Sequence, residues 1–179
     1  MRRLSLFLIA VLAGAPLVPS AMSAQTPAAG SREYQLRVLE HERKFLLQMA
    51  DSMPERLYRD RATPEQRDFA QQVHHAANGV VFLLTVTKSG PKPTLPDTAE
   101  AFHNRAGLRS FINAAYDYAA GVLRGQSDTA RRESVELFGQ SMPRWQLWDE
   151  IHTHTVWTAG QVVANFRKHG MAPPAFTFF

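Results

Sequence analysis

The last helix-sized stretch, residues 143–169, constrains the fold of this chain more than any other feature. It is bounded by Pro143 and Gly170, and two further prolines follow shortly afterwards. Glycine adopts the left-handed conformation that closes a helix, and proline cannot continue one. The basic side chains of Lys168 and His169 lie at the end where the helix dipole is negative. The pattern therefore predicts one long helix.

One face of that helix is polar. Four polar residues recur at helical spacing: His154, Thr158, Gln161 and Asn165. The spacing of i, i+4, i+7 and i+11 places them on the same side of the helix. Polar groups inside a helical bundle cost free energy unless they find partners. We therefore interpret this face as one wall of a site.

The first 24 residues have the pattern of a secretory signal. Arg2 and Arg3 precede an apolar run over residues 4–17, and small residues follow. The apolar run is shorter than the roughly twenty residues that a membrane span needs. We predict that the signal is removed and that residues 25–179 form one periplasmic or secreted domain. The alternative is an uncleaved signal, which would be the only contact with a membrane.

Composition excludes several functional classes. The chain has no cysteine, which excludes a cysteine nucleophile, thiolate metal ligands and disulfides. The formal net charge is +4, with Lys and Arg spread among Asp and Glu. This distribution argues against a nucleic-acid-binding surface.

Three further helical segments precede the final one. Apolar stripes at helical spacing predict helices over residues 31–53, 63–87 and 98–125. Pro54 ends the first of them, because the residue before a proline avoids the helical region. The chain shows no convincing strand pattern. We therefore predict an all-α fold, an antiparallel four-helix bundle.

Some local details of these helices follow from single residues. Thr63 and Gln66 have the spacing of a capping box and predict the start of the second helix. Gly107 is expected to divide the third helix into two pieces. Gly79 and Gly160 lie inside helices, at a cost of about 1 kcal/mol each relative to alanine. Close approach of neighbouring helices would explain both.

Two histidines are candidates for a site inside the bundle. His75, on the second helix, and His154 can face each other across the interior, and neutral imidazole is the commonest protein metal ligand. Catalytic zinc usually takes three protein ligands. The natural third position, one turn beyond His154, holds Thr158, and a neutral hydroxyl is a poor substitute. His41 is an alternative third ligand. Equally, both imidazoles can be core histidines that are hydrogen-bonded to each other or to nearby glutamines.

The neighbouring histidines are expected to lie elsewhere. His74 and His152 are turned by about 100° or 200° from the two candidates around their helices, so we expect them to face solvent. No catalytic triad, phosphate-binding glycine loop or paired-carboxylate motif stands out.

Two motifs in the chain resemble the DinB-like superfamily of metal-binding four-helix bundles. The first, over residues 69–82, reads Phe-Ala-Gln-Gln-Val-His-His-Ala-Ala-Asn-Gly-Val-Val-Phe. The second begins at His154, reads His-x-x-x-Thr-x-Gly-Gln, and is followed by Gly-Met-Ala-Pro-Pro at residues 170–174. The family pattern is His-x-x-x-His-x-Gly-Gln with a similar Gly-x-x-Pro-Pro end. The similarity covers nearly all of the chain after the signal.

The resemblance implies a centre for a divalent metal (zinc, nickel or iron) with ligands at His75, His154 and Thr158. Thr158 departs from the family pattern. The resemblance also implies a metal-dependent enzyme that acts on a small-molecule substrate in thiol-dependent transfer, isomerase or hydrolase chemistry, and pairing as a homodimer. The alternative is a metal-free binding or interaction protein that keeps the bundle and has lost the centre. The retained imidazoles favour the enzyme, and Thr158 favours the alternative.

Overall fold

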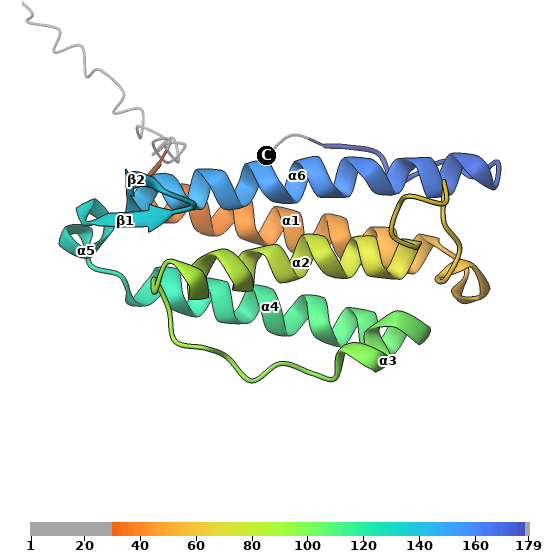
Figure 1. Cartoon of the computed structure of the whole chain (residues 1–179), viewed down its shortest axis with the longest axis horizontal. Helices are drawn as coiled ribbons and strands as arrows, with labels where there is room; N and C mark the ends of the chain where they lie inside the picture. The colour runs from red at the N-terminus through yellow and green to blue at the C-terminus, as the bar shows by residue number, and fades with distance from the viewer. Residues whose placement is uncertain (1–29, 178–179) are drawn as a thin grey trace, which may run out of the picture.

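The computed structural model describes residues 30–177, which form a bundle of four long helices (Figure 1). These are α1 (Arg32–Ser52), α2 (Phe69–Val86), α4 (Arg105–Gly125) and α6 (Arg144–Lys168). The shorter elements are η1 (Glu55–Leu57), α3 (Thr98–His103), α5 (Asp128–Arg132), β1 (Ser134–Leu137) and β2 (Gln140–Pro143). The predicted all-α bundle is confirmed. The predicted export signal lies outside the described residues.

The four long helices run up, down, down and up along the bundle. α2 packs against α6, and α1 packs against α4, as antiparallel pairs (Figure 1). α2 and α4 also pack together, but they are parallel, because the loop over residues 87–97 crosses the length of the bundle before α3. Bundles with such a crossover are a known variant of the four-helix architecture. The order places α2 and α6, which carry the two candidate histidines, side by side.

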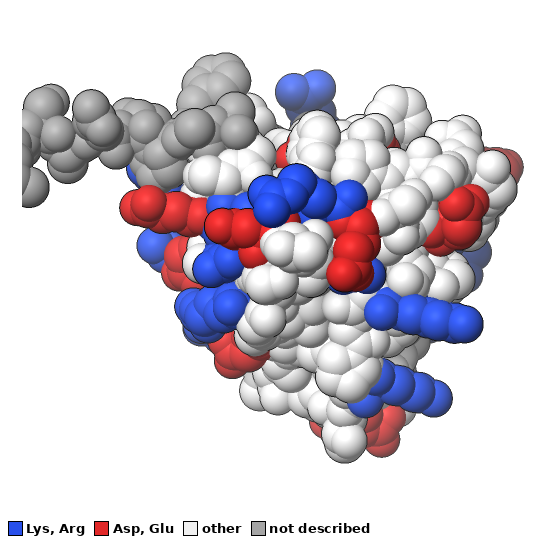
Figure 2. Space-filling model, turned by 90° about the vertical axis from the view of Figure 1, so that its left-hand side faces the viewer, with Lys and Arg blue, Asp and Glu red and all other residues white. Residues whose placement is uncertain are grey.

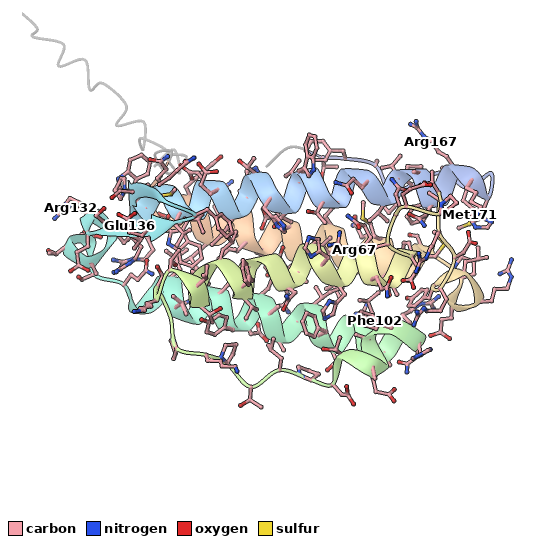
Figure 3. All side chains as sticks on the ribbon, viewed as in Figure 1. Arg67, Phe102, Arg132, Glu136, Arg167 and Met171 are labelled. Atoms are coloured by element: carbon pink, nitrogen blue, oxygen red, sulfur yellow. The ribbon has the colours of Figure 1, made fainter. Side chains whose placement is uncertain are left out.

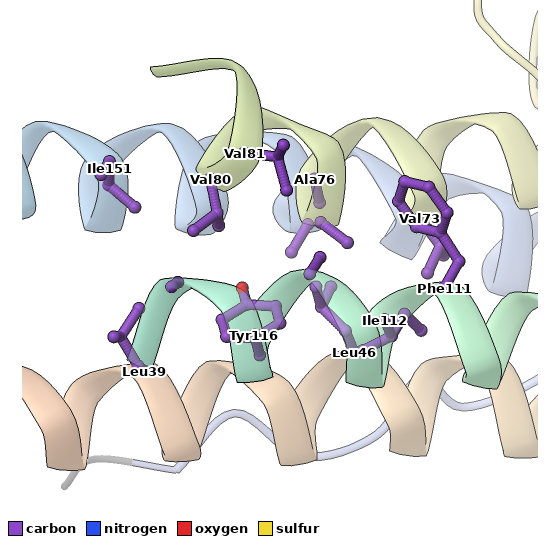
Figure 4. Packing of buried hydrophobic residues seen from close by; sticks show 14 of the residues in the cluster. Leu39, Leu46, Val73, Ala76, Val80, Val81, Phe111, Ile112, Tyr116 and Ile151 are labelled. Carbon is purple, nitrogen blue, oxygen red and sulfur yellow. The ribbon is translucent and has the colours of Figure 1, made fainter. Parts of the chain in front are cut away.

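The apolar stripes of all four long helices meet in one core (Figure 4). Phe69 at the start of α2 and Phe166 near the end of α6 are both fully buried. Their rings pack edge to face, with centroids 5.7 Å apart and an interplanar angle of 83°. This geometry is favoured by aromatic pairs and adds to their area burial. The contact fixes α6 against α2.

The first helix begins and the last helix ends where the sequence predicted. The Ser31 hydroxyl accepts a hydrogen bond from the backbone N–H of Tyr34 at 3.1 Å and caps α1. At the end of α6, Gly170 has a φ of 66°, and the N–H of Met171 donates to the carbonyl of Phe166 at 3.0 Å. This is the Schellman arrangement that glycine permits.

The start of α2 differs from the prediction, because the capping box at Thr63 and Gln66 does not form. Asp68 caps the helix instead: its carboxylate accepts from the Gln71 N–H at 2.8 Å, and the Gln71 side chain accepts from the Asp68 N–H at 3.3 Å. The Asp68 side chain is 1% exposed, and its second oxygen pairs with Arg59 Nε at 2.7 Å. A carboxylate with these bonds, at the positive end of the helix dipole, is a stronger cap than the hydroxyl of Thr63.

The third predicted helix is divided at Asn104 and not at Gly107. Asn104 has an extended backbone, with φ −143° and ψ 157°, and ends α3. Its side chain accepts a hydrogen bond from the Gly107 N–H at 2.7 Å and so caps α4. Asparagine is a strong N-cap residue, which explains why a new helix starts here.

The hairpin of β1 and β2 is a third difference from the sequence prediction. The strands pair antiparallel through Leu137 and Gln140, with Phe138 and Gly139 as the turn. Both turn residues have positive φ values, 50° and 79°, which is the type I′ geometry of two-residue hairpins. Strands of four residues give too short an alternation to be distinguished from a loop.

The surface of the bundle carries charges of both signs. Figure 2 views the end that holds α5 and the hairpin, where Lys and Arg side chains interleave with Asp and Glu. That face therefore carries no extended field of a single sign. None of the helices within residues 30–177 combines the length and apolar character needed to cross a lipid bilayer.

Candidate functional site

The structure brings His75 and His154 together across the interface of α2 and α6. Their ring centroids are 5.3 Å apart, and the rings are inclined at 73°. Both residues are partly buried. The packing of α2 on α6 therefore places two imidazoles at one position, where a single small group can contact both.

Gly79 makes this approach possible. A Cβ atom at Gly79 would collide with the imidazole of His154, so the ring packs directly on the α2 backbone. Only glycine leaves that space without moving the ring. Close approach is confirmed as the reason for Gly79. The same explanation is wrong for Gly160, because no atom lies within 4 Å of the position that a Cβ at Gly160 would take.

The surroundings of the pair favour neutral imidazoles. Burial lowers the pKa of His75, and the positive charges of Arg67 and His154 lower it further. Burial and the charge of Arg67 also lower the pKa of His154. Arg67, labelled in Figure 3, comes from the segment before α2. The positive charge of Arg67, which adds to burial in keeping the imidazoles neutral, also opposes a divalent cation beside them.

His154 retains an unused hydrogen-bonding atom. Its Nδ1 is buried and has no hydrogen-bond partner within the described residues. A buried polar atom without a partner is uncommon in a folded protein and indicates a place where a ligand or ion can bind. A neutral imidazole can offer a lone pair to a metal or accept a hydrogen bond from a small molecule.

Thr158 lies on the face of α6 that contacts α2, one turn beyond His154, and is 2% exposed. Its carbonyl oxygen accepts a hydrogen bond from Gln72 Nε2 at 3.3 Å, and the same amide donates to Gln161 Oε1 at 3.1 Å. The polar face that the sequence indicated on α6 therefore does meet α2. Gln72, 4% exposed, is its partner and was not singled out from the sequence.

The residues at the pair do not fit a three-ligand metal centre. Within residues 30–177, no His, Cys, Asp or Glu completes a group of three that could hold an ion. His41, the alternative third ligand, lines a cavity between α1 and α6 instead. Protein zinc ligands are cysteine, histidine and carboxylates, and a threonine hydroxyl is not among them. The pair itself supplies two imidazoles.

His74 does not face solvent as the sequence predicted. Its ring packs on Phe111, with centroids 3.9 Å apart, and on Phe102 (Figure 3), at 5.0 Å. Burial and the charge of His75 lower the pKa of His74 to about 4. The prediction failed because α2 is covered by α6 on one side and by α3 and α4 on another.

A second cluster of titratable groups lies between α1 and α6. Glu42 is 3% exposed, its Oε1 lies 2.6 Å from His152 Nδ1, and its Oε2 accepts a hydrogen bond from the Tyr116 hydroxyl at 3.3 Å. Burial raises the pKa of Glu42 to about 7, even though the bonds to His152 and Tyr116 oppose that change. The hydrogen bond between Glu42 and His152 in turn raises the pKa of His152. His152 is therefore hydrogen-bonded to Glu42 while its side chain remains 33% exposed, so the prediction that it faces solvent holds only in part.

Glu42 and His152 line a cavity of about 390 Å³ between α1, α6 and the C-terminal segment. This segment returns along α6 after Gly170 (Figure 1). Apolar side chains make up most of the wall: Phe45, Met49, Val156, Ala159, Val163, Pro173, Pro174 and Phe176. Phe176 packs edge-on against Phe45, with centroids 6.0 Å apart, which ties the segment to α1. Neither His75 nor His154 belongs to this wall.

The fold is that of a DinB-like protein. The structure is similar to the crystal structure of a DinB-like protein from Bacillus cereus ATCC 10987, with a TM-score of 0.64 and 18% sequence identity. The match covers 81% of this chain and 97% of that chain. No family model and no curated protein matches the sequence. At this identity the likeness establishes the fold, and the functional argument comes from the residues themselves.

Proposed function

We propose that this chain is an exported DinB-like binding protein in which the His75–His154 pair is the remainder of a divalent metal centre. One observation carries the proposal: the third ligand position holds Thr158, and no other His, Cys, Asp or Glu in residues 30–177 replaces it. Two imidazoles beside the charge of Arg67 form a weak cation site. They remain suited to a small molecule that donates a hydrogen bond to a neutral imidazole.

The second candidate is a metal-dependent enzyme of the thiol-transfer kind. The convergence of the rings at 5.3 Å and the unpartnered Nδ1 of His154 favour it. In that case the family's zinc, nickel or iron would be held by His75 and His154 alone among the predicted ligands. The metal affinity of the unmodified protein separates the two candidates.

Isothermal titration of the metal-stripped protein, prepared without a histidine tag, provides that measurement. We expect zinc to bind with a dissociation constant of about 1 µM or weaker, because a structural zinc site with a full ligand set gains far more free energy. His154→Ala should weaken this binding further. The matched control is His103→Ala, which removes an exposed imidazole from α3 and should leave the titration unchanged. Tight, stoichiometric zinc binding that His154→Ala abolishes would support the enzyme instead.

The export part of the proposal concerns the N-terminus. The basic start and the short apolar run predict cleavage near Ala24 and release of a mature protein that lacks residues 1–24. Mass spectrometry of the protein recovered from the periplasm or medium should show a new N-terminus close to residue 25. Recovery of chains that retain Met1, in the membrane fraction only, would contradict cleavage.

A further inference from the structure

We propose that the cavity between α1 and α6 binds a chain-like amphipathic acid, an acyl chain that ends in a carboxylate, with the carboxylate at Arg167. The inference names a ligand class for the proposed binding protein and rests on that function. It uses a different part of the molecule from the His75–His154 pair. Its test is therefore independent of metal affinity.

The shape of the cavity favours a chain over a compact molecule. Its wall includes His152, Val156, Gly160, Val163 and Arg167, which follow one another along one side of α6. His152 and Arg167 are fifteen residues apart, or about 22 Å along a helix. The volume of about 390 Å³ falls within the usual range for small-molecule sites, and the wall is mostly apolar. An apolar cavity whose lining residues extend along this much of one helix suits an alkyl chain.

The two ends of the groove differ in charge, and this difference orients the ligand. At one end the Glu42 carboxyl and the His152 imidazole are hydrogen-bonded to each other, so each already has a partner. At the other end Arg167 is exposed and carries a full positive charge. Its neighbour Lys168 is paired with Asp60 at 2.9 Å, whereas Arg167 has no carboxylate partner within the described residues. An anionic head group is therefore expected at Arg167.

Arg167 also lies where it can bind a carboxylate at the mouth of the groove. Figure 3 shows it on the side of α6 along which the C-terminal segment returns. Pro173, Pro174 and Phe176 of that segment form the opposite wall. A carboxylate at Arg167 would remain in contact with water while the alkyl chain lies under the segment. Arginine can hold such a carboxylate with two parallel hydrogen bonds.

Gly160 provides a variant that blocks the groove without harming the helix. It lines the cavity, and no atom lies within 4 Å of the position of its Cβ, so a side chain can begin at this position without a clash. We expect a leucine side chain here to occupy space in the groove. Leucine is also the better helix former, so Gly160→Leu should fold at least as well as the parent. Gly121→Leu in α4 is the matched control, because Gly121 is equally unobstructed and lies away from this cavity.

The experiment is isothermal titration of the untagged mature protein with decanoate and 1-decanol, in the presence of a metal chelator. We expect saturable binding of one decanoate, about tenfold tighter than decanol, because a charged partner strengthens the hydrogen bonds of Arg167. Octanoate should bind more weakly by about fourfold per missing methylene. Arg167→Gln should bring decanoate and decanol to the same affinity. Gly160→Leu should bind both at least about tenfold more weakly, and Gly121→Leu should match the parent.

Several results would overturn the inference. Failure of both decanoate and decanol to bind saturably would show that the groove takes no chain-like ligand. Equal affinity for decanoate and decanol in the parent would exclude the acid at Arg167. Parent-like binding by Gly160→Leu would place the ligand elsewhere. Because the chelator removes metal from every sample, none of these outcomes bears on zinc affinity, which tests the proposed function separately.

Discussion

Replacing Glu42 with glutamine should remove most of the loss of stability that accompanies a rise in pH from about 5 to about 8. The folded protein holds the pKa of Glu42 at about 7, above the ordinary value of 4.5. Below 4.5 the carboxyl is protonated in both the folded and the unfolded states and contributes its full stability. As the pH rises through about 7, the folded state must carry a buried charge that the unfolded state exposes to water, and this stability is lost.

The expected size of the Glu42 effect is large for one residue. A pKa difference between 4.5 and about 7 corresponds to about 3 kcal/mol of unfolding free energy at pH values above both. The raised pKa of His152 acts in the same direction. The stability that His152 contributes is also lost as the pH rises through the pKa of His152 in the folded protein. The bond to Glu42 is the main cause of that shift, so Glu42→Gln should reduce both contributions.

Urea unfolding across this pH range measures the effect as the difference between Glu42→Gln and the parent. The unfolding free energy of the variant relative to the parent should rise by about 3 kcal/mol from pH 5 to pH 8. The lowered pKa values of His74, His75 and His154 destabilise the fold as the pH falls below 6.5. This loss of stability at low pH is common to the variant and the parent, so it cancels in the difference between them.

The control for Glu42 is Glu40→Gln, the same chemical change on the exposed side of α1. Within residues 30–177, Glu40 pairs with the surface residues Arg43 and Lys44, and such pairs contribute about 0–1 kcal/mol. Its stability difference from the parent should therefore change little with pH. Parallel profiles for Glu42→Gln and the parent would show that the carboxyl is not destabilised by burial.

Replacing Thr158 with histidine should turn a weak cation site into a strong one. The new imidazole would lie one turn beyond His154 on the face of α6 that meets α2, where Thr158 contacts Gln72. Three nitrogen ligands are the protein contribution to many zinc sites. We expect zinc or nickel to bind at least about 100-fold more tightly than to the parent. At a metal concentration 100 times the dissociation constant, the melting temperature should rise by roughly 5–10 °C.

Two further variants separate metal binding from a packing effect. Thr158 is buried, so a larger side chain costs about 1–3 kcal/mol before any metal is added. Thr158→Leu imposes a similar steric change without a ligand and should show no metal-dependent gain. Combining Thr158→His with His154→Ala should abolish the gain, because only two imidazoles would remain. Equal zinc affinity in the parent and Thr158→His would mean that position 158 does not face His75.

The helices could be predicted from the sequence because their signals are local. Ser31 and Gly170 mark the ends of α1 and α6 by the backbone geometry that their side chains allow. The convergence of His75 and His154 followed from their faces once a bundle was assumed. The start of α2 was misplaced because two capping sequences compete, and Asp68 wins through a tertiary partner, Arg59, which local spacing does not reveal.

The groups between α1 and α6 depend on tertiary contacts. Glu42 follows Leu39 by three residues and precedes Leu46 by four, so its place on the apolar stripe of α1 was visible in the sequence. Its partner His152 could not be identified, because helical spacing fixes the angle of a residue around its own helix but not which helix covers it. The same limit led to the wrong prediction for His74, whose side of α2 is packed against Phe102 and Phe111.

The visible absorption spectrum of bound cobalt(II) tests the central claim most directly, because it reports the geometry of the ligands around the ion. A tetrahedral site with three protein ligands absorbs strongly, whereas a loosely held, largely hydrated ion absorbs weakly. Metal-stripped parent protein should give only the weak spectrum, and Thr158→His should give the strong one. A strong tetrahedral spectrum from the parent, lost in both His75→Ala and His154→Ala, would contradict the account and establish a complete metal centre.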